Sequence, residues 1–134
     1  VTAFAAVSVC EAIESISQKA PQIKWVNDVF IDGKKVCGIL TEAVTDFESG
    51  GLEWVVLGIG INVYIRTEDF PDDLQHSATS IYPDENMPGM RNKLSAEIIN
   101  RILGFETLPS EKEIFEKYKK RLAIVMLLCY NKSV

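Results

Sequence analysis

The sequence lacks the residues from which several common functional sites are built. Cys10, Cys37 and Cys129 are odd in number and far apart, so the chain has no CxxC metal or redox unit, and free thiols fit a reducing cytosol. His76 is the single histidine and no Gly-x-Ser-x-Gly segment occurs, which argues against a hydrolase triad. A P-loop is also missing. These absences turn attention to sites built from lysine, amide and carboxylate side chains.

Charge and hydropathy argue against two further classes. The formal net charge is -5, and the arginines are scattered at Arg66, Arg91, Arg101 and Arg121, so we expect no nucleic-acid partner and no phosphate-binding arginine cluster. The longest fully apolar stretch, 122–130, is far too short to span a bilayer, and no secretory signal is recognised. We therefore expect a cytoplasmic protein that does not bind a membrane.

The chain is long enough for one domain. Its 134 residues are 47% hydrophobic, which fits a single globular unit that buries roughly two thirds of its unfolded surface. The first residue is Val1 rather than methionine, from which we expect a processed or truncated product.

Apolar periodicity predicts an α+β chain. A packed helix is expected over 2–18, where polar residues recur at helical spacing. Strands are predicted over 23–31, 35–44 and 52–64, and Asp32-Gly33 between the first two is a strong hairpin signal. Consecutive strands joined by short turns predict an antiparallel meander and not a Rossmann crossover.

The second half is predicted to be a long surface loop followed by helices. The loop covers 66–89 and contains three prolines, and a helix is expected over 92–103. Ser110 and Glu113 match a capping box at the start of another helix. Residues 123–130 are predicted to form one more strand.

Two lysines are the first candidates for chemistry. Lys24 and Lys35 border the predicted hairpin, whose register could bring both onto the same side of the sheet. Two nearby ammonium groups repel each other, so such a placement is reasonable where a ligand anion balances them. The alternative is that the hairpin lysines are ordinary solvated side chains.

An Asn-Asp pair follows directly. Asn27 and Asp28 lie inside a strand-like run although both residue types prefer turns, so a bulge or a second turn is one interpretation. In the functional interpretation, Asp28 orients a lysine or takes a proton from an incoming amine.

Three glycines interrupt strongly apolar strands. Gly38, Gly58 and Gly60 each weaken a strand by roughly 0.5–1 kcal/mol relative to alanine, which suggests a surface kept bare for a ligand. Asn62 ends the last strand, where its amide could pair with an adenine edge or simply occupy a turn.

Two weaker candidates have ordinary explanations. Asp69, Asp72 and Asp73 are interpreted as a solvated loop face, with a bound divalent cation as the remote alternative, so no metal site is assigned. Cys37 is expected to be a small core residue and not a nucleophile.

These same residues resemble the biotin protein ligases. The family pattern is Lys-Trp-Pro-Asn-Asp, then Lys-[Ile/Leu/Val]-x-Gly-Ile-Leu-x-Glu, then Gly-x-Gly-x-Asn, and here the three motifs occupy 24–28, 35–42 and 58–62 in that order. Val26 stands where the family has proline. The resemblance runs from about Val1 to Leu122 and includes Ala78-Thr79-Ser80 of the loop.

The resemblance implies a fold and a reaction. The fold would be a mixed, largely antiparallel sheet with helices, related to class II aminoacyl-tRNA synthetases. The reaction would join biotin to ATP, with Mg2+, as biotinyl-5'-AMP, and then transfer biotin to a lysine of the biotin carboxyl carrier domain of a carboxylase.

The resemblance also implies residue roles. The catalytic residues would be Lys35, Lys24 and Asp28. Lys35 would contact the biotin carboxylate and the phosphate, Lys24 would help to hold the phosphate charge or the intermediate, and Asp28 would face the incoming lysine amine. The nucleotide would be bound by Lys24, Asn27 and Asn62. The biotin trough would be lined by Gly38, Ile39, Gly58 and Gly60.

Several parts of the family pattern are missing. Neither the Ser/Thr-rich biotin loop nor the Gly-Arg-Gly-Arg-x-Gly-Arg segment occurs, so 1–134 is expected to be a partial catalytic domain without its N-terminal half or the C-terminal β domain. Such a fragment would have little activity alone. The alternatives are a lipoate or octanoyl ligase or transferase of the same fold, and a non-catalytic biotin-binding remnant that could form a homodimer.

Overall fold

A computed structural model describes residues 1–85, 87–104 and 109–123 as an α+β arrangement of a sheet and helices. The sheet has the strand order β1-β2-β3-β4, and each neighbouring pair is antiparallel. Two isolated parallel bridges add to it, between Ile23 and Leu122 and between Lys35 and Ala78. The predicted meander and fold class are confirmed.

The first predicted strand is wrong as a single element. It is two strands, β1 (Gln22–Lys24) and β2 (Asp28–Ile31), which pair antiparallel around a turn at residues 25–27. The second-turn interpretation of the Asn-Asp pair therefore holds, because both residue types favour turns over strand interiors. The Trp25–Val26 peptide bond within this turn is cis.

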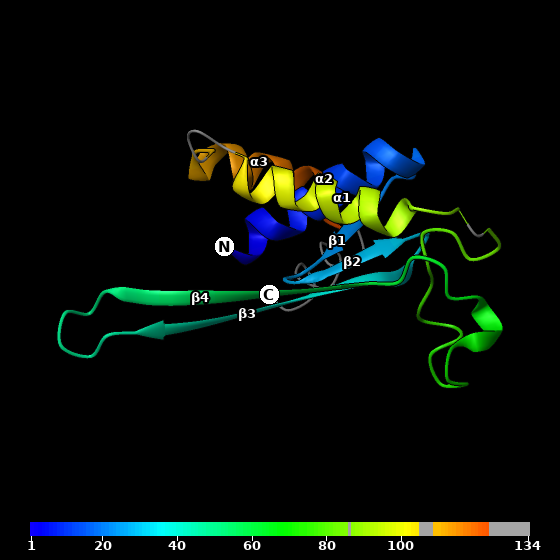
Figure 1. Cartoon of the computed structure of the whole chain (residues 1–134), viewed down its shortest axis with the longest axis horizontal. Helices are drawn as coiled ribbons and strands as arrows, with labels where there is room; N and C mark the ends of the chain where they lie inside the picture. The colour runs from blue at the N-terminus through cyan, green and yellow to red at the C-terminus, as the bar shows by residue number, and fades with distance from the viewer. Residues whose placement is uncertain (86, 105–108, 124–134) are drawn as a thin grey trace, which may run out of the picture.

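The other two strands form a long hairpin. A turn with positive φ at Asp32 (49°) and Gly33 (77°) connects β2 to β3 (Lys34–Thr45), as the Asp-Gly signal predicted. β4 (Leu52–Ile61) pairs along nearly the whole of β3, and ends three residues before the predicted boundary. In Figure 1 this β3–β4 hairpin projects well beyond the helices.

The helices lie together on one face of the sheet (Figure 1). They are α1 (Thr2–Ser17), α2 (Met90–Leu103) and α3 (Glu111–Arg121), with a short 3-10 helix, η1 (Thr67–Asp69), in the intervening loop. The capping box is confirmed, since the Ser110 side chain accepts from the Glu113 amide while the Glu113 carboxylate accepts from the Ser110 amide.

The core lies between α1 and the sheet. Because α1 touches the strands on one side and both other helices on the other, most of its surface is apolar and buried. The largest fully buried apolar side chains come from α1 and from β1, β2 and β3, together with one residue of the loop: Val9, Ile13, Ile23, Val29, Val36 and Ile81.

Ion pairs join the helices to one another. On α1, Glu14 accepts two bonds of 3.0 Å from Arg121, and Glu11 lies 2.9 Å from Lys117. Arg101 of α2 also reaches Glu11, at 3.4 Å. These contacts fix α3 against α1, which matters below because α3 touches the β1–β2 turn.

The last predicted strand falls mainly outside the described residues. Only its first residue, Ala123, is described, and its amide donates to the Ile23 carbonyl at 2.9 Å. Within the described residues, no helix has both the length and the apolar content needed to cross a bilayer.

Candidate functional site

The open face of the sheet carries a row of candidate residues that crosses all four strands. Lys24 of β1 lies opposite Asp28 of β2, Asp28 opposite Gly38 of β3, and Gly38 opposite Gly60 of β4. Directly paired residues of antiparallel strands share a face, so these residues lie on one face. Leu40 and Gly58 form the next pair along β3 and β4 on that face.

A register shift brings Lys35 to this face. Between Val29 and Phe30 the pairing slips by one residue, so Phe30 lies opposite Lys35 and not opposite Val36. Without this bulge, Lys35 would point toward the helices, because side chains alternate along a strand. The bulge therefore decides that both candidate lysines lie on the same side, as the hairpin argument had suggested.

Lys35 is held by a carboxylate of the row. Its Nζ lies 2.8 Å from Asp28 Oδ1, with side chains that are 45% and 27% exposed. Lys24 Nζ lies 5.4 Å from the centre of the Phe30 ring, a cation–π distance. The sequence argument had left the compensation of the two ammonium groups to a ligand anion, but Asp28 and Phe30 already compensate them in part.

The glycines leave the face bare without being required by packing. A Cβ added at Gly58 or Gly60 would meet its nearest atoms at 3.7 Å and 3.9 Å, and one added at Gly38 would meet Lys35 Cε and Nζ at 3.4 Å. These are ordinary van der Waals distances. The chain itself therefore has room for alanine at each position, so the glycines serve no packing need that we can identify within the described residues.

Asn27 fastens the turn to β3. Its carbonyl accepts from the Ile39 amide at 2.9 Å, and its side-chain Nδ2 donates to the Ile39 carbonyl at 2.8 Å. The Ile39 side chain is 2% exposed and belongs to the core cluster, so this residue borders the open face through its main chain. The proposed nucleotide contact of Asn27 and biotin contact of Ile39 stay predictions.

Asn62 and the loop segment 77–79 brace the same end of β3. Asn62 Nδ2 donates to the Thr79 carbonyl at 3.1 Å, while the Asn62 amide donates to the Val36 carbonyl at 2.9 Å. The main chain of Lys35 is bonded on both sides, to the Ser77 carbonyl and the Thr79 amide, at 2.8 Å each. The loop thus fixes the backbone from which Lys35 projects.

Two residues of the site were missed from the sequence. Phe30, the ring partner of Lys24, and Leu40, which is 61% exposed beside Gly58, were not among the candidates named from the sequence. Counting two residues onward from Gly38 and from Asp28 would have found them, because alternate residues share a face.

Cys37 is confirmed as a core residue. It is 1% exposed on the helix-facing side of β3, and burial is the main cause that raises its pKa to about 12, with a further upward effect of Asp28. A thiol that keeps its proton at neutral pH is a poor nucleophile.

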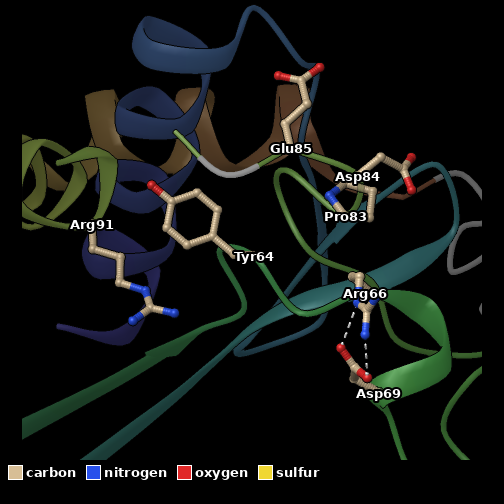
Figure 2. A pocket seen from close by; sticks show the side chains of 7 residues that line it. All are labelled: Tyr64, Arg66, Asp69, Pro83, Asp84, Glu85 and Arg91. Atoms are coloured by element: carbon tan, nitrogen blue, oxygen red, sulfur yellow. Dashed lines mark hydrogen bonds and ion pairs between the residues drawn. The ribbon is translucent and has the colours of Figure 1, made fainter. Parts of the chain in front are cut away.

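A polar hollow beside the loop is separate from this row. Figure 2 shows it, with a volume of about 410 Å³ and walls that include Tyr64, Arg66, Asp84 and Arg91. Arg66 Nε is paired with Asp69 Oδ2 at 2.9 Å, and Arg91 lies 5.1 Å from the centre of the Tyr64 ring. Its cations are therefore already matched by partners of the same chain.

Two of the loop aspartates, Asp69 and Asp72, have partners within the loop. Asp69 is bound by Arg66, and Asp72 Oδ1 accepts from Gln75 at 3.3 Å. Across the described residues, no group of three or more His, Cys, Asp or Glu side chains is placed to hold a metal ion.

Comparison with known proteins gives consistent relatives. Residues 2–62 match the Biotin/lipoate A/B protein ligase family. The chain is 46% identical over 80 residues to the Bifunctional ligase/repressor BirA of Bacillus spizizenii (strain ATCC 23059 / NRRL B-14472 / W23), an alignment that covers 60% of this chain and 24% of the relative. The chain thus spans about a quarter of the length of the curated relatives it matches.

Solved structures extend the likeness to nearly the whole chain. The apo biotin protein ligase from Aquifex aeolicus is similar with a TM-score of 0.68 and 29% identity, covering 91% of this chain and 52% of that one. The same ligase in complex with biotin and ATP is similar with a TM-score of 0.59 and 28% identity, covering 90% of this chain and 44% of that one.

Proposed function

We propose that this chain, whose residues 2–62 match the Biotin/lipoate A/B protein ligase family, forms one wall of a site that activates biotin with ATP. The observation that carries the proposal is the row of Lys24, Asp28, Gly38 and Gly60, with Lys35 held beside it on the open face. Solved relatives that bind biotin, or biotin and ATP, support the two ligands.

The first step would be formation of biotinyl-5'-AMP. A biotin carboxylate oxygen attacks the α-phosphorus of ATP, the new P–O bond forms, and pyrophosphate leaves with the electrons of the broken bond. Carboxylate and phosphate repel each other as they approach. Lys35 and Lys24 on the same face would offset that repulsion with fixed positive charge, the kind of preorganised stabilisation that lowers a barrier most.

The glycine positions would receive the body of biotin. Gly38, Gly58 and Gly60 present backbone and no side chain on the open face, so a flat ring system could lie directly on the sheet. Ile39 would contribute its main chain only. The adenine would meet Asn62 and Asn27, whose side-chain nitrogens already donate to carbonyls and whose amide oxygens could accept from the base.

The second step would transfer biotin to a lysine of a carrier domain. The neutral lysine amine attacks the acyl carbon of the mixed anhydride, AMP leaves, and the nitrogen loses a proton to give an amide. Asp28 is suited to accept that proton or to orient the amine, because its ion pair with Lys35 uses Oδ1 and leaves Oδ2 for a second partner.

Magnesium would enter with ATP and not through a preformed protein site. The described residues offer no cluster of three metal-binding side chains, and Mg2+ commonly binds through substrate phosphates with one or two carboxylates. When bound, it would neutralise phosphate charge.

A second candidate is a ligase or transferase for lipoate or octanoate. The family description names lipoate as well as biotin, and a sheet face without side chains at Gly38, Gly58 and Gly60 would also admit a linear acyl chain. Competition between biotin and lipoate for the chain, measured by titration calorimetry, separates the two: only the true substrate should show saturable binding.

The decisive experiment measures pyrophosphate release and biotinyl-5'-AMP formation with biotin and Mg-ATP. Because the chain spans about half of the solved ligase chain, we expect weak biotin binding and slow turnover alone, and faster turnover when a polypeptide supplying the remainder is added. In the complemented system, Lys35→Ala should cost about 2.7–4 kcal/mol of transition-state stabilisation.

The matched control is Lys34→Ala. Lys34 is the neighbouring hairpin lysine, and its Nζ donates to the Gln75 carbonyl at 3.3 Å. It should keep near-normal turnover. If Lys35→Ala also did so, the assignment of Lys35 would be refuted. Saturable biotin binding without any biotinyl-5'-AMP after complementation would instead identify a non-catalytic biotin-binding remnant.

A further inference from the structure

A candidate functional residue lies at each end of the β1–β2 turn. Lys24 is the last residue of β1 and Asp28 the first of β2, and they lie opposite each other across the turn. The strands that flank the turn are only three and four residues long. Within the turn, Trp25 is 64% and Val26 38% exposed, so little of its own surface is packed. The positions of Lys24 and Asp28 thus depend on what else holds the turn.

Two anchors meet the turn from opposite sides. Asn27 attaches it to β3, through both bonds to Ile39 described above. From the helical layer, the Tyr118 hydroxyl donates to the Val26 carbonyl at 3.0 Å, and the Tyr118 ring meets the Trp25 ring edge-on, with centroids 6.1 Å apart and planes at 87°.

Tyr118 is itself a fixed point. Its side chain is 4% exposed, and burial raises the pKa of its hydroxyl, so the proton that it donates is retained at neutral pH. The preceding residue, Lys117, is paired with Glu11, and Arg121 is paired with Glu14 one turn later. These ion pairs connect α3 to α1, and so to the core.

We infer that Tyr118 is a positioning residue for the ligand-binding row, acting through the Val26 carbonyl to hold Lys24 and Asp28 in register across the turn. The expected effect of Tyr118 on ligand binding rests on the proposed function. The expected effect of Tyr118 on the position of the turn does not depend on that function. Without the hydroxyl, the Val26 carbonyl loses its buried donor, and the turn can move relative to β3.

Tyr82 provides a matched control. Its hydroxyl also donates to a main-chain carbonyl, that of Ile16, at 3.0 Å, and its side chain is 8% exposed. Tyr118→Phe and Tyr82→Phe therefore each remove one buried phenol–carbonyl hydrogen bond and keep the ring. Both variants should fold and should lose similar stability in urea.

The experiment compares the two variants by two measurements. The first is the affinity of the full chain for biotinyl-5'-AMP. The second is the fluorescence anisotropy of Trp25 in a Trp54→Phe background, since these are the two tryptophans of the sequence. Tyr118→Phe should weaken binding by roughly three- to tenfold, the worth of one hydrogen bond, and should lower the anisotropy of Trp25. Tyr82→Phe should change neither beyond twofold.

Each result decides the inference. Equal effects of the two variants, or no effect of Tyr118→Phe, would overturn it. If the unaltered chain does not bind biotinyl-5'-AMP, the proposed function fails for the chain alone, and anisotropy becomes the deciding measurement. A lower anisotropy of Trp25 in Tyr118→Phe alone then supports the inference that Tyr118 positions the turn. An unchanged anisotropy in Tyr118→Phe overturns that inference.

Discussion

The two faces of the sheet use the same strands for opposite purposes. On the helix-facing side, Ile23, Val29 and Ile39 are 0–2% exposed and belong to the core. On the open side, the residues directly beside them in sequence are Lys24, Asp28 and Gly38. The helix-facing side stabilises the fold by burying apolar surface. The open side contributes less to stability, because it makes few apolar contacts and carries residues with low strand propensity.

This difference indicates that residues of the covered face determine the stability of the fold, whereas residues of the open face are available for ligand binding. Fully burying a large aliphatic side chain contributes about 1.5–3 kcal/mol, whereas each strand glycine costs roughly 0.5–1 kcal/mol relative to alanine. Because alternate residues face opposite ways, a single strand such as β3 can do both without conflict. Substitutions on the two faces should therefore separate changes in unfolding free energy from changes in ligand affinity.

The largest expected effect is on the covered face. Ile39→Ala should lower the free energy of unfolding by about 2–5 kcal/mol, because it leaves a cavity in the core beneath α1. Leu40→Ala, one residue further along and 61% exposed, should change it by less than about 0.5 kcal/mol. Urea titration checks both. Comparable losses would mean that the open face is packed after all.

An intermediate effect is expected from filling the bare face. Gly60→Val should weaken biotin binding by about ten- to hundredfold, since its side chain would occupy space that a ligand needs. It should leave the free energy of unfolding unchanged or slightly higher, because valine favours strands. Calorimetric titration with biotin measures the change in affinity, and urea titration measures the change in the free energy of unfolding. Thr45→Val, at the exposed far end of β3, serves as the control and should affect neither quantity appreciably.

The smallest effect concerns Cys37, which lies with Val36 on the covered face, between the open-face residues Lys35 and Gly38 in sequence. Burial raises its pKa from 9.0 to about 12. The folded chain thus keeps a proton that the unfolded chain loses, so this contribution to stability is complete below about pH 9 and is lost as pH rises toward 12. At pH 8, iodoacetamide should modify Cys37 in urea and leave it unmodified in the native chain. Rapid native modification would place its thiol on the open face.

Much of the fold followed from local pattern. The helix over 2–18, the Asp32-Gly33 turn and the Ser110–Glu113 capping box were predictable, because each depends on neighbours within a few residues. The β1–β2 break was predicted only as an alternative. In residues 23–31 an apolar run and a turn-forming Asn-Asp pair compete, and pairing with β3 through Asn27 decides in favour of the turn.

The candidate site divides in the same way. The lysines, the glycines and Asp28 could be named from the sequence because of their chemistry. Lysine binds anions, glycine exposes the backbone of a strand, and a carboxylate can bind an amine. The roles of Phe30 and Tyr118 could not, since they depend on a cation–π contact across β1 and β2 and on a hydrogen bond between residues 92 positions apart.

The sequence by itself determined the motifs, the antiparallel pairing of consecutive strands and the resemblance to the biotin protein ligases, because residue types and short-range turn signals can be identified along the chain. Only the tertiary structure decided which face Lys35 occupies, through a bulge between Val29 and Phe30, and which helix supports the turn beside Lys24. A one-residue slip in register reverses the direction of a side chain, and that slip is selected by packing between distant segments.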